Sequence, residues 1–64
     1  MKMSEKDRLQ EQLLVMQSDM LRLKNFTYKK EYEQMNSAEK YLVAEQYKLE
    51  MKLIDIIQAR LSLL

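Results

Sequence analysis

The stretch MNSAEKYL, residues 35–42, decides the fold of this chain. Asn36 is followed three residues later by Glu39, which is the spacing of a capping box with Asn in the place of Ser or Thr. Such a pair opens a helix, so it predicts that one helix ends before Asn36 and another begins just after it. The alternative is one uninterrupted helix in a long coiled coil, because no Gly or Pro separates the two halves.

The apolar residues on either side of this stretch follow two different helical frames. The upstream frame consists of Leu9, Leu13, Met16, Met20 and Leu23, and the downstream frame of Leu42, Leu49, Ile56 and Leu63, supported by Leu53 and Ile57. Beyond Leu23 the first frame reaches only polar residues, and a coiled-coil seam must keep facing its partner. We therefore predict an all-α fold, an antiparallel two-helix hairpin in a single domain over residues 1–64. Its helices are expected at about 5–35 and about 38–63, with a turn at about 36–37.

The length and composition of the chain point to self-association. A core in a chain of 64 residues rarely supplies more than about 3–5 kcal/mol, and without Cys or His neither disulfides nor a structural zinc site can add to it. The segment LIDIIQARLSLL, residues 53–64, is apolar on more than one face. We therefore expect a homo-oligomeric helical bundle, and the alternative is a C-terminus that is merely sticky. The predicted interface residues are Leu49, Leu53, Ile56, Ile57 and Leu61.

The side chains that catalysis most often uses are scarce. The chain has no His, no Cys and no Gly, so it lacks a general base that titrates near neutral pH, a thiol nucleophile and a Gly-rich phosphate loop. We therefore expect no enzyme, no cofactor and no metal. The net charge is only +1, which argues against a binder of polymeric nucleic acid. No apolar run approaches the ~18 residues of a membrane span, so we expect a cytoplasmic protein without a membrane partner.

The basic stretch LRLKNFTYKK, residues 21–30, is the best candidate for a binding site. Phosphate oxygens suit Lys and Arg, and a nucleobase can stack on an aromatic ring. The candidate ligand-binding residues here are Arg22, Lys24, Thr27, Tyr28 and Lys29. The alternative is structural: Arg22 and Lys24 on a solvated face, and Lys29 near a helix C-terminus, where a cation is favourable.

The two halves together carry a family resemblance. The first helix ends with Leu23 and Phe26 in an L-x-x-F pattern, followed by Tyr32 and Met35, and the second helix carries Leu42, Gln46, Met51, Ile57, Arg60 and Leu61. This arrangement resembles the helical-hairpin domain of phage proteins that act as cyclic-nucleotide sponges against CBASS and Thoeris immunity. The chain departs from the family pattern at Lys29, where a small hydroxyl residue is common.

The resemblance implies an oligomer of hairpins that holds cyclic di- or trinucleotides between subunits without cleaving them. It also implies that Arg60 contacts the ligand, the alternative being a surface Arg near a helix C-terminus. If the chain is phage-encoded, its location is the cytoplasm of the host cell. A second hypothesis is a protein–protein interaction module or inhibitor whose apolar helix docks on a host protein. A third is a hairpin dimer that binds nucleic acid through its basic stretch.

Overall fold

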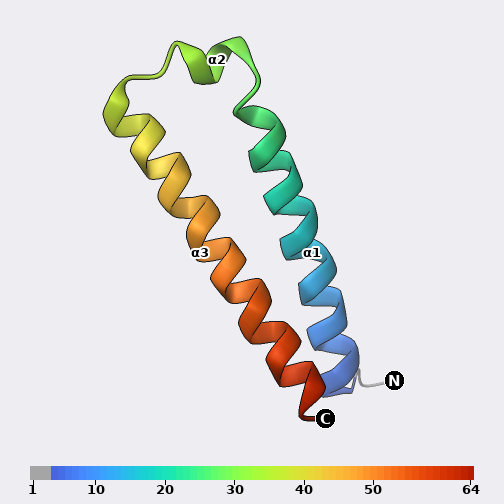
Figure 1. Cartoon of the computed structure of the whole chain (residues 1–64). Coiled ribbons are helices and arrows are strands. Elements are labelled where there is room, and N and C mark those ends of the chain that lie inside the picture. The colour runs from blue at the N-terminus through green and yellow to red at the C-terminus, as the bar shows by residue number, and fades with distance from the viewer. Residues whose placement is uncertain (1–3) are drawn as a thin grey trace.

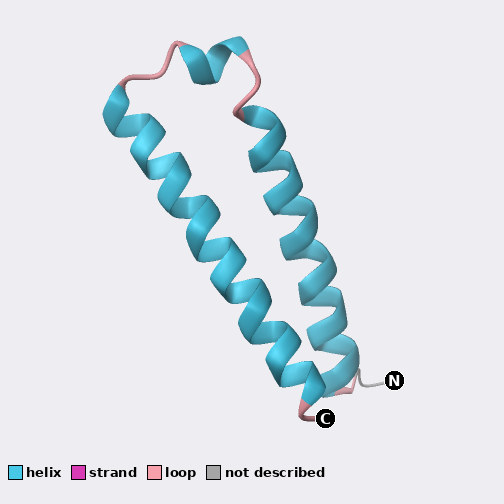
Figure 2. Cartoon of the chain, viewed as in Figure 1, coloured by secondary structure: helices cyan, strands magenta, loops and turns pink. Residues whose placement is uncertain are grey.

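The computed structural model describes residues 4–64 of the chain, which form two long helices and a short one. The helices are α1 (Glu5–Phe26), α2 (Lys30–Glu33) and α3 (Ser37–Ser62). Helices α1 and α3 run antiparallel side by side, α2 crosses between their ends, and the start of α1 lies beside the end of α3 at the opposite end of the hairpin (Figure 1). The part of the chain that the structure describes contains no strand (Figure 2). The all-helical hairpin predicted from the sequence is therefore confirmed.

Both long helices begin at side-chain caps, and the Asn36 cap of α3 is the one predicted above from the sequence. The Asp7 amide donates to Ser4 Oγ over 3.1 Å at the start of α1. The Glu39 amide donates to Asn36 Oδ1 over 2.8 Å at the start of α3, and Asn36 Nδ2 donates to Glu39 Oε1 over 3.3 Å. Each cap satisfies an amide that has no partner within its helix.

Helix α1 ends at Phe26 rather than near residue 35, where the sequence places its end. The amides of Thr27, Tyr28 and Lys29 donate to carbonyl groups three residues earlier, and this tight pattern closes the helix. The Thr27 hydroxyl also donates to the Lys24 carbonyl over 2.6 Å. Lys29 then takes an extended conformation and starts α2 without a side-chain cap. The connection between α1 and α3 is thus longer than the predicted turn at 36–37, and it contains the short helix α2.

Aromatic packing holds α2 across the end of the hairpin. The Phe26 and Tyr32 rings meet edge to face, with centroids 6.0 Å apart. Lys40 of α3 places its Nζ 5.4 Å from the centre of the Tyr32 ring. Tyr32 therefore links the end of α1 to the start of α3 through a ring contact and a cation–π contact.

The core lies at the end of the hairpin where α1 begins and α3 ends. The buried apolar side chains of the described residues are Leu9, Ile54 and Ile57, and Ile57 is only 1% exposed. Leu13, Met16, Met20 and Leu23 are half-buried and extend this core along α1, as the first apolar frame predicts. The molecule is 46 Å long, and the two helices diverge toward α2 (Figure 1).

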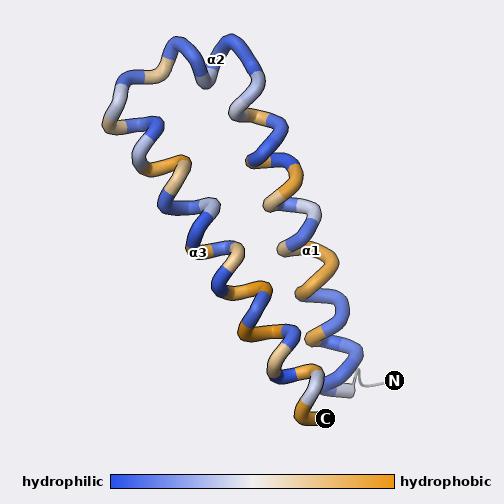
Figure 3. The backbone as a smooth tube through the Cα atoms, viewed as in Figure 1, coloured by the Kyte–Doolittle hydropathy of each residue, from blue (hydrophilic) through white to orange (hydrophobic). Residues whose placement is uncertain are grey.

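Helix α3 packs on α1 through a different row of residues from the one that repeats every seven. The inward-facing residues are Val43, Tyr47, Glu50, Ile54, Ile57 and Leu61, each buried or half-buried. The row Leu42, Leu49, Ile56 and Leu63 lies one position away and remains exposed. Orange apolar segments accordingly recur along α3 over most of its length (Figure 3). No helix among residues 4–64 is long and apolar enough to cross a membrane.

Candidate functional site

Five of the six candidate ligand-binding residues lie near the loop end of the hairpin. Arg22, Lys24, Thr27, Tyr28 and Lys29 belong to the last turns of α1 and the segment that follows it. Arg22 and Lys24 flank Leu23, and since successive residues are about 100° apart around a helix, they face opposite sides of the hairpin. The basic stretch therefore contributes to two separate depressions, one on each side.

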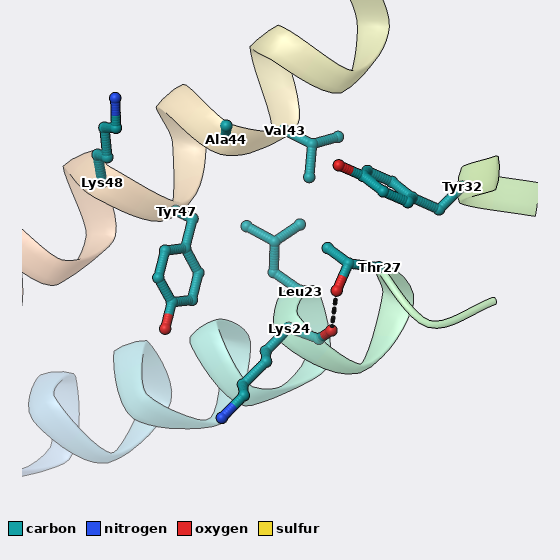
Figure 4. Close-up of a pocket in the computed structure, with 8 residues that line it drawn as sticks. All are labelled: Leu23, Lys24, Thr27, Tyr32, Val43, Ala44, Tyr47 and Lys48. Carbon is teal, nitrogen blue, oxygen red and sulfur yellow. Dashed lines mark hydrogen bonds between the residues drawn. The ribbon is translucent and has the colours of Figure 1, made fainter. Parts of the chain in front are cut away.

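The first depression is small and mainly apolar (Figure 4). It has a volume of about 290 Å³ and is lined by Leu23, Lys24, Thr27, Tyr32, Val43, Ala44, Tyr47 and Lys48. The ammonium groups of Lys24 and Lys48 point away from its centre (Figure 4), and Lys48 Nζ lies 3.4 Å from Glu45 Oε1. Because the Thr27 hydroxyl already donates to the Lys24 carbonyl, this side offers a ligand little beyond apolar contact.

The second depression is larger and more polar. It has a volume of about 510 Å³ and is lined by Asp19, Arg22, Leu23, Phe26, Lys29, Gln46 and Glu50. Arg22 Nη2 lies 3.9 Å from Asp19 Oδ1, and the Arg22 side chain is 82% exposed. Two cations, two carboxylates, an amide and an aromatic ring therefore surround one hollow. Its volume falls within the roughly 300–1,000 Å³ of small-molecule sites.

Gln46 and Glu50 of this depression were not predicted as ligand-binding residues. They lie on α3, far in sequence from the basic stretch, and only the hairpin brings them beside Arg22 and Lys29. Gln46 could have been noticed in the sequence, since it is a polar residue that interrupts the outward apolar row of α3. No sequence pattern marks Glu50 as a ligand-binding residue. Its Oε2 atom is buried and has no hydrogen-bond partner among the described residues.

The two remaining candidates do not join either depression. Tyr28 lines neither hollow, and its side chain is largely exposed. Arg60 lies at the opposite end of the molecule, where its Nη2 lies 2.9 Å from Glu5 Oε1. The two groups form an exposed ion pair beside a hollow of about 320 Å³ that Arg8, Leu9 and Gln12 complete. A single hairpin therefore does not bring Arg60 to the other five candidates.

The predicted interface residues divide into two sets. Leu49, Leu53 and Ile56 are exposed on α3, whereas Ile57 is buried and Leu61 half-buried. Ile57 and Leu61 therefore belong to the packing of α3 on α1 within one chain. Leu49 and Leu53 border a groove of about 440 Å³ that Met16, Leu42, Glu45, Gln46 and Glu50 also line. Gln46 and Glu50 are shared with the second depression, so the groove and that depression are continuous.

No cluster of three or more His, Cys, Asp or Glu side chains that could hold a metal ion occurs within residues 4–64.

The polar groups that the hairpin gathers at its loop end suit ligand binding through hydrogen bonds and ion pairs. The chain was compared with protein-family models, curated proteins and solved structures, and none of the three comparisons found a match.

Proposed function

We propose that this chain is a homo-oligomeric, phage-encoded anti-immune sponge that binds cyclic oligonucleotide second messengers at subunit interfaces and sequesters them without cleavage. The observation that carries the proposal is the second depression, where Arg22, Lys29, Phe26 and Gln46 surround one hollow at the loop end. The family resemblance of the sequence supports the same class of ligand. Sequestration lowers the concentration of free signal, so the host effector stays inactive.

The cations of the depression are available to phosphate groups. Arg22 is largely exposed, and its separation of 3.9 Å from Asp19 is long for an ion pair, so that pair holds it weakly. Lys29 takes part in none of the ion pairs found among residues 4–64. Charge-assisted hydrogen bonds from such groups to phosphate oxygens are stronger than bonds between neutral partners.

The remaining groups suit a nucleobase. The Gln46 amide can donate and accept at once, which matches the edge of a base. Phe26 provides an aromatic surface in the same hollow, although its ring already packs against Tyr32. Asp19 and Glu50 balance the two cations, so a bare anion gains little net attraction here. A ligand that carries both phosphates and amino groups matches this mixture of charges better.

Self-association is the second part of the proposal. The hairpin leaves the exposed row of α3 without a partner, and its buried core consists of three apolar side chains among the described residues. Such a core is small for a chain of this length. A second copy that covers the α3 row removes apolar surface from water and adds to the stability of the fold.

The test is a calorimetric and thermal-shift screen of the purified protein against cyclic di- and trinucleotides. A ligand at a hundredfold its Kd stabilises the fold by about 2.7 kcal/mol, and release by denaturation should return it intact. Arg22→Ala and Lys29→Ala should weaken binding at least tenfold. Lys48→Ala, in the first depression, is the matched control and should bind normally. If none of the cyclic di- and trinucleotides binds, or if a bound one is recovered as a cleaved product, the result would contradict the proposal.

A second candidate function is a protein-interaction module. The specific observation in its favour is the exposed α3 row, since amphipathic helices commonly dock through such surfaces. This function predicts a chain that is monomeric on its own, does not respond to cyclic nucleotides and forms a one-to-one complex with a protein of the infected host. Mass measurements in solution on the free chain, together with the nucleotide screen, separate the two functions.

A further inference from the structure

Helix α3 carries a second, complete heptad register on its exposed side. We call it the outer stripe: Leu42, Gln46, Leu49, Leu53, Ile56, Arg60 and Leu63, spaced alternately four and three residues apart. Leu42, Leu49 and Leu63 are 64%, 66% and 86% exposed, and Leu53 and Ile56 are exposed as well. This alternation is the pattern of a helix that packs along a partner helix over its whole length.

The outer stripe is more apolar than the inward-facing row over the half of α3 nearest the loop. Over residues 42–50 the inward row consists of Val43, Tyr47 and Glu50, whereas the outer stripe consists of Leu42, Gln46 and Leu49. A helix with only one partner buries its most apolar side. Because the hairpin leaves the outer stripe exposed, the sequence of α3 suits a helix that packs on α1 with one side and on another helix with the other.

The exposed area reaches the lower limit for one such partner. The five apolar residues of the outer stripe present on the order of 600 Å² per chain, so two copies that covered it completely would bury at most on the order of 1,200 Å², the lower bound for specific interfaces. The neighbouring groove along Met16 and Glu50 adds to this area. A second copy of the chain therefore offers a surface of matching length and character.

We infer that the outer stripe is covered by α3 of a second copy running antiparallel, with the two-fold axis near Leu53. The inference rests on the self-association proposed above and specifies its geometry. The midpoint of the stripe lies between Lys52 and Leu53, so full overlap of the two stripes requires an axis at this point. Leu42 of each copy then lies near Leu63 of the partner subunit.

Arg60 and the helix dipoles favour the antiparallel orientation, although Glu50 then lies level with Asp55 of the partner subunit. A parallel two-fold pair sets every residue against itself, which would bring two Arg60 guanidinium groups together within an apolar seam. It would also align the two helix dipoles, with like ends adjacent. The antiparallel pair avoids both contacts. Arg60 and Glu45 are equally far from the midpoint of the stripe, so each Arg60 comes level with Glu45 of the partner subunit.

The same arrangement places Arg60 of the partner subunit beside Gln46. Gln46 lines both the groove and the second depression, so Arg60 of the partner subunit comes level with the edge of the hollow that contains Arg22 and Lys29, where its guanidinium can exchange Glu5 for a ligand. Arg60 lies at the far end of its own hairpin, and only an antiparallel neighbour can bring it to this position. The orientation of the pair thus determines which residues can share a site.

Single cysteines test the orientation directly, because the native chain has none. Gln46→Cys and Arg60→Cys chains, treated separately with a short bis-maleimide, should remain unlinked, since in an antiparallel pair identical positions lie about 14 residues or roughly 21 Å apart along the axis. An equimolar mixture of the two, unfolded and refolded together, should yield a linked dimer. Leu53→Cys should link to itself, whereas Leu14→Cys, exposed on α1, should not.

The mass of each protein in solution and its helical circular dichroism are recorded alongside. Linking of Gln46→Cys to itself would establish a parallel pair and overturn the inference while leaving self-association intact. A native chain that stays monomeric at high concentration would overturn both. Failure of the nucleotide screen would contradict the proposed ligand alone, since cross-linking is measured without ligand. Selective linking in the mixture, with native helicity in both variants, is the expected result.

Discussion

At the scale of single residues, Asn36 is the cap on which the hairpin depends. Its Oδ1 accepts from the Glu39 amide over 2.8 Å, and its Nδ2 donates to the Glu39 carboxylate. The two contacts satisfy a free amide at the start of α3 and hold the chain in an extended conformation just before it. A helix that ran through this point would lose both contacts.

We expect Asn36→Ala to lower the free energy of unfolding by about 1 kcal/mol, because a helix amide loses its acceptor. Urea titration followed by circular dichroism at 222 nm would measure the change at one fixed protein concentration. Asn36→Ser retains a neutral acceptor oxygen, as Ser4 provides for α1, and is the matched control. Equal stability of the Ala and Ser variants would show that the cap does not contribute.

Ile56 and Ile57 are neighbours with opposite surroundings. Ile57 is 1% exposed in the core, whereas Ile56 lies in the outer stripe. We expect Ile57→Ala to lower the free energy of unfolding by about 2–5 kcal/mol through a buried cavity, and so to reduce the helix content well below that of the native chain at each concentration. Ile56→Ala should retain the hairpin but weaken self-association. Helical circular dichroism over a dilution series separates the two effects, and equal behaviour of the variants would contradict the assignment of the two rows.

At the scale of elements, α2 is a clamp rather than a continuation of α1. Tyr32 contacts Phe26 edge to face and lies under Lys40, so one side chain links the last turn of α1 to the first turn of α3. Because the two helices diverge toward this end, the clamp acts where their own packing is weakest (Figure 1). It also positions Phe26 and Lys29 beside the second depression.

We expect Tyr32→Ala to release this clamp without melting the core. Backbone amides of residues 27–36 should exchange with solvent faster, while amides near Leu9 and Ile54 keep their protection, since local opening costs less than global unfolding. Tyr41→Ala, at an exposed position of α3, is the control and should change neither region. Hydrogen exchange followed by mass spectrometry or NMR measures both. Uniformly faster exchange along the chain would contradict the local role of Tyr32.

At the scale of the whole molecule, the hairpin is long and thinly packed. It measures 46 Å by 20 Å by 14 Å, and the buried apolar side chains of residues 4–64 cluster at one end. A shape of this kind exposes much of both helices. Additional burial through assembly is therefore the most direct way to stabilise it.

We expect the midpoint of thermal unfolding to rise with protein concentration, because association stabilises the folded state by mass action. Leu49→Glu places a charge in the outer stripe and should abolish that dependence. Leu14→Glu makes the same change at an exposed position of α1 and should keep it. Circular dichroism melts over a hundredfold range of concentration measure the trend. A midpoint independent of concentration in the native chain would contradict assembly.

The sequence by itself determined the helical class, the break at Asn36 and the inward stripe of α1, since these follow from composition, capping and a single apolar period. It did not determine the early end of α1, because the residues after Phe26 are compatible with helix and only the packing of Tyr32 on Phe26 and Lys40 favours a turn.

Only the tertiary structure decided which side of α3 faces α1. Residues 53–57 are apolar on two adjacent stripes, so periodicity alone cannot choose between Leu53 with Ile56 and Ile54 with Ile57. The packing of α3 on α1 at the end of the hairpin opposite α2 buried the second pair, together with Leu9. The same packing separated Arg60 from the basic stretch and brought Gln46 to it, because an antiparallel hairpin pairs the end of one helix with the beginning of the other.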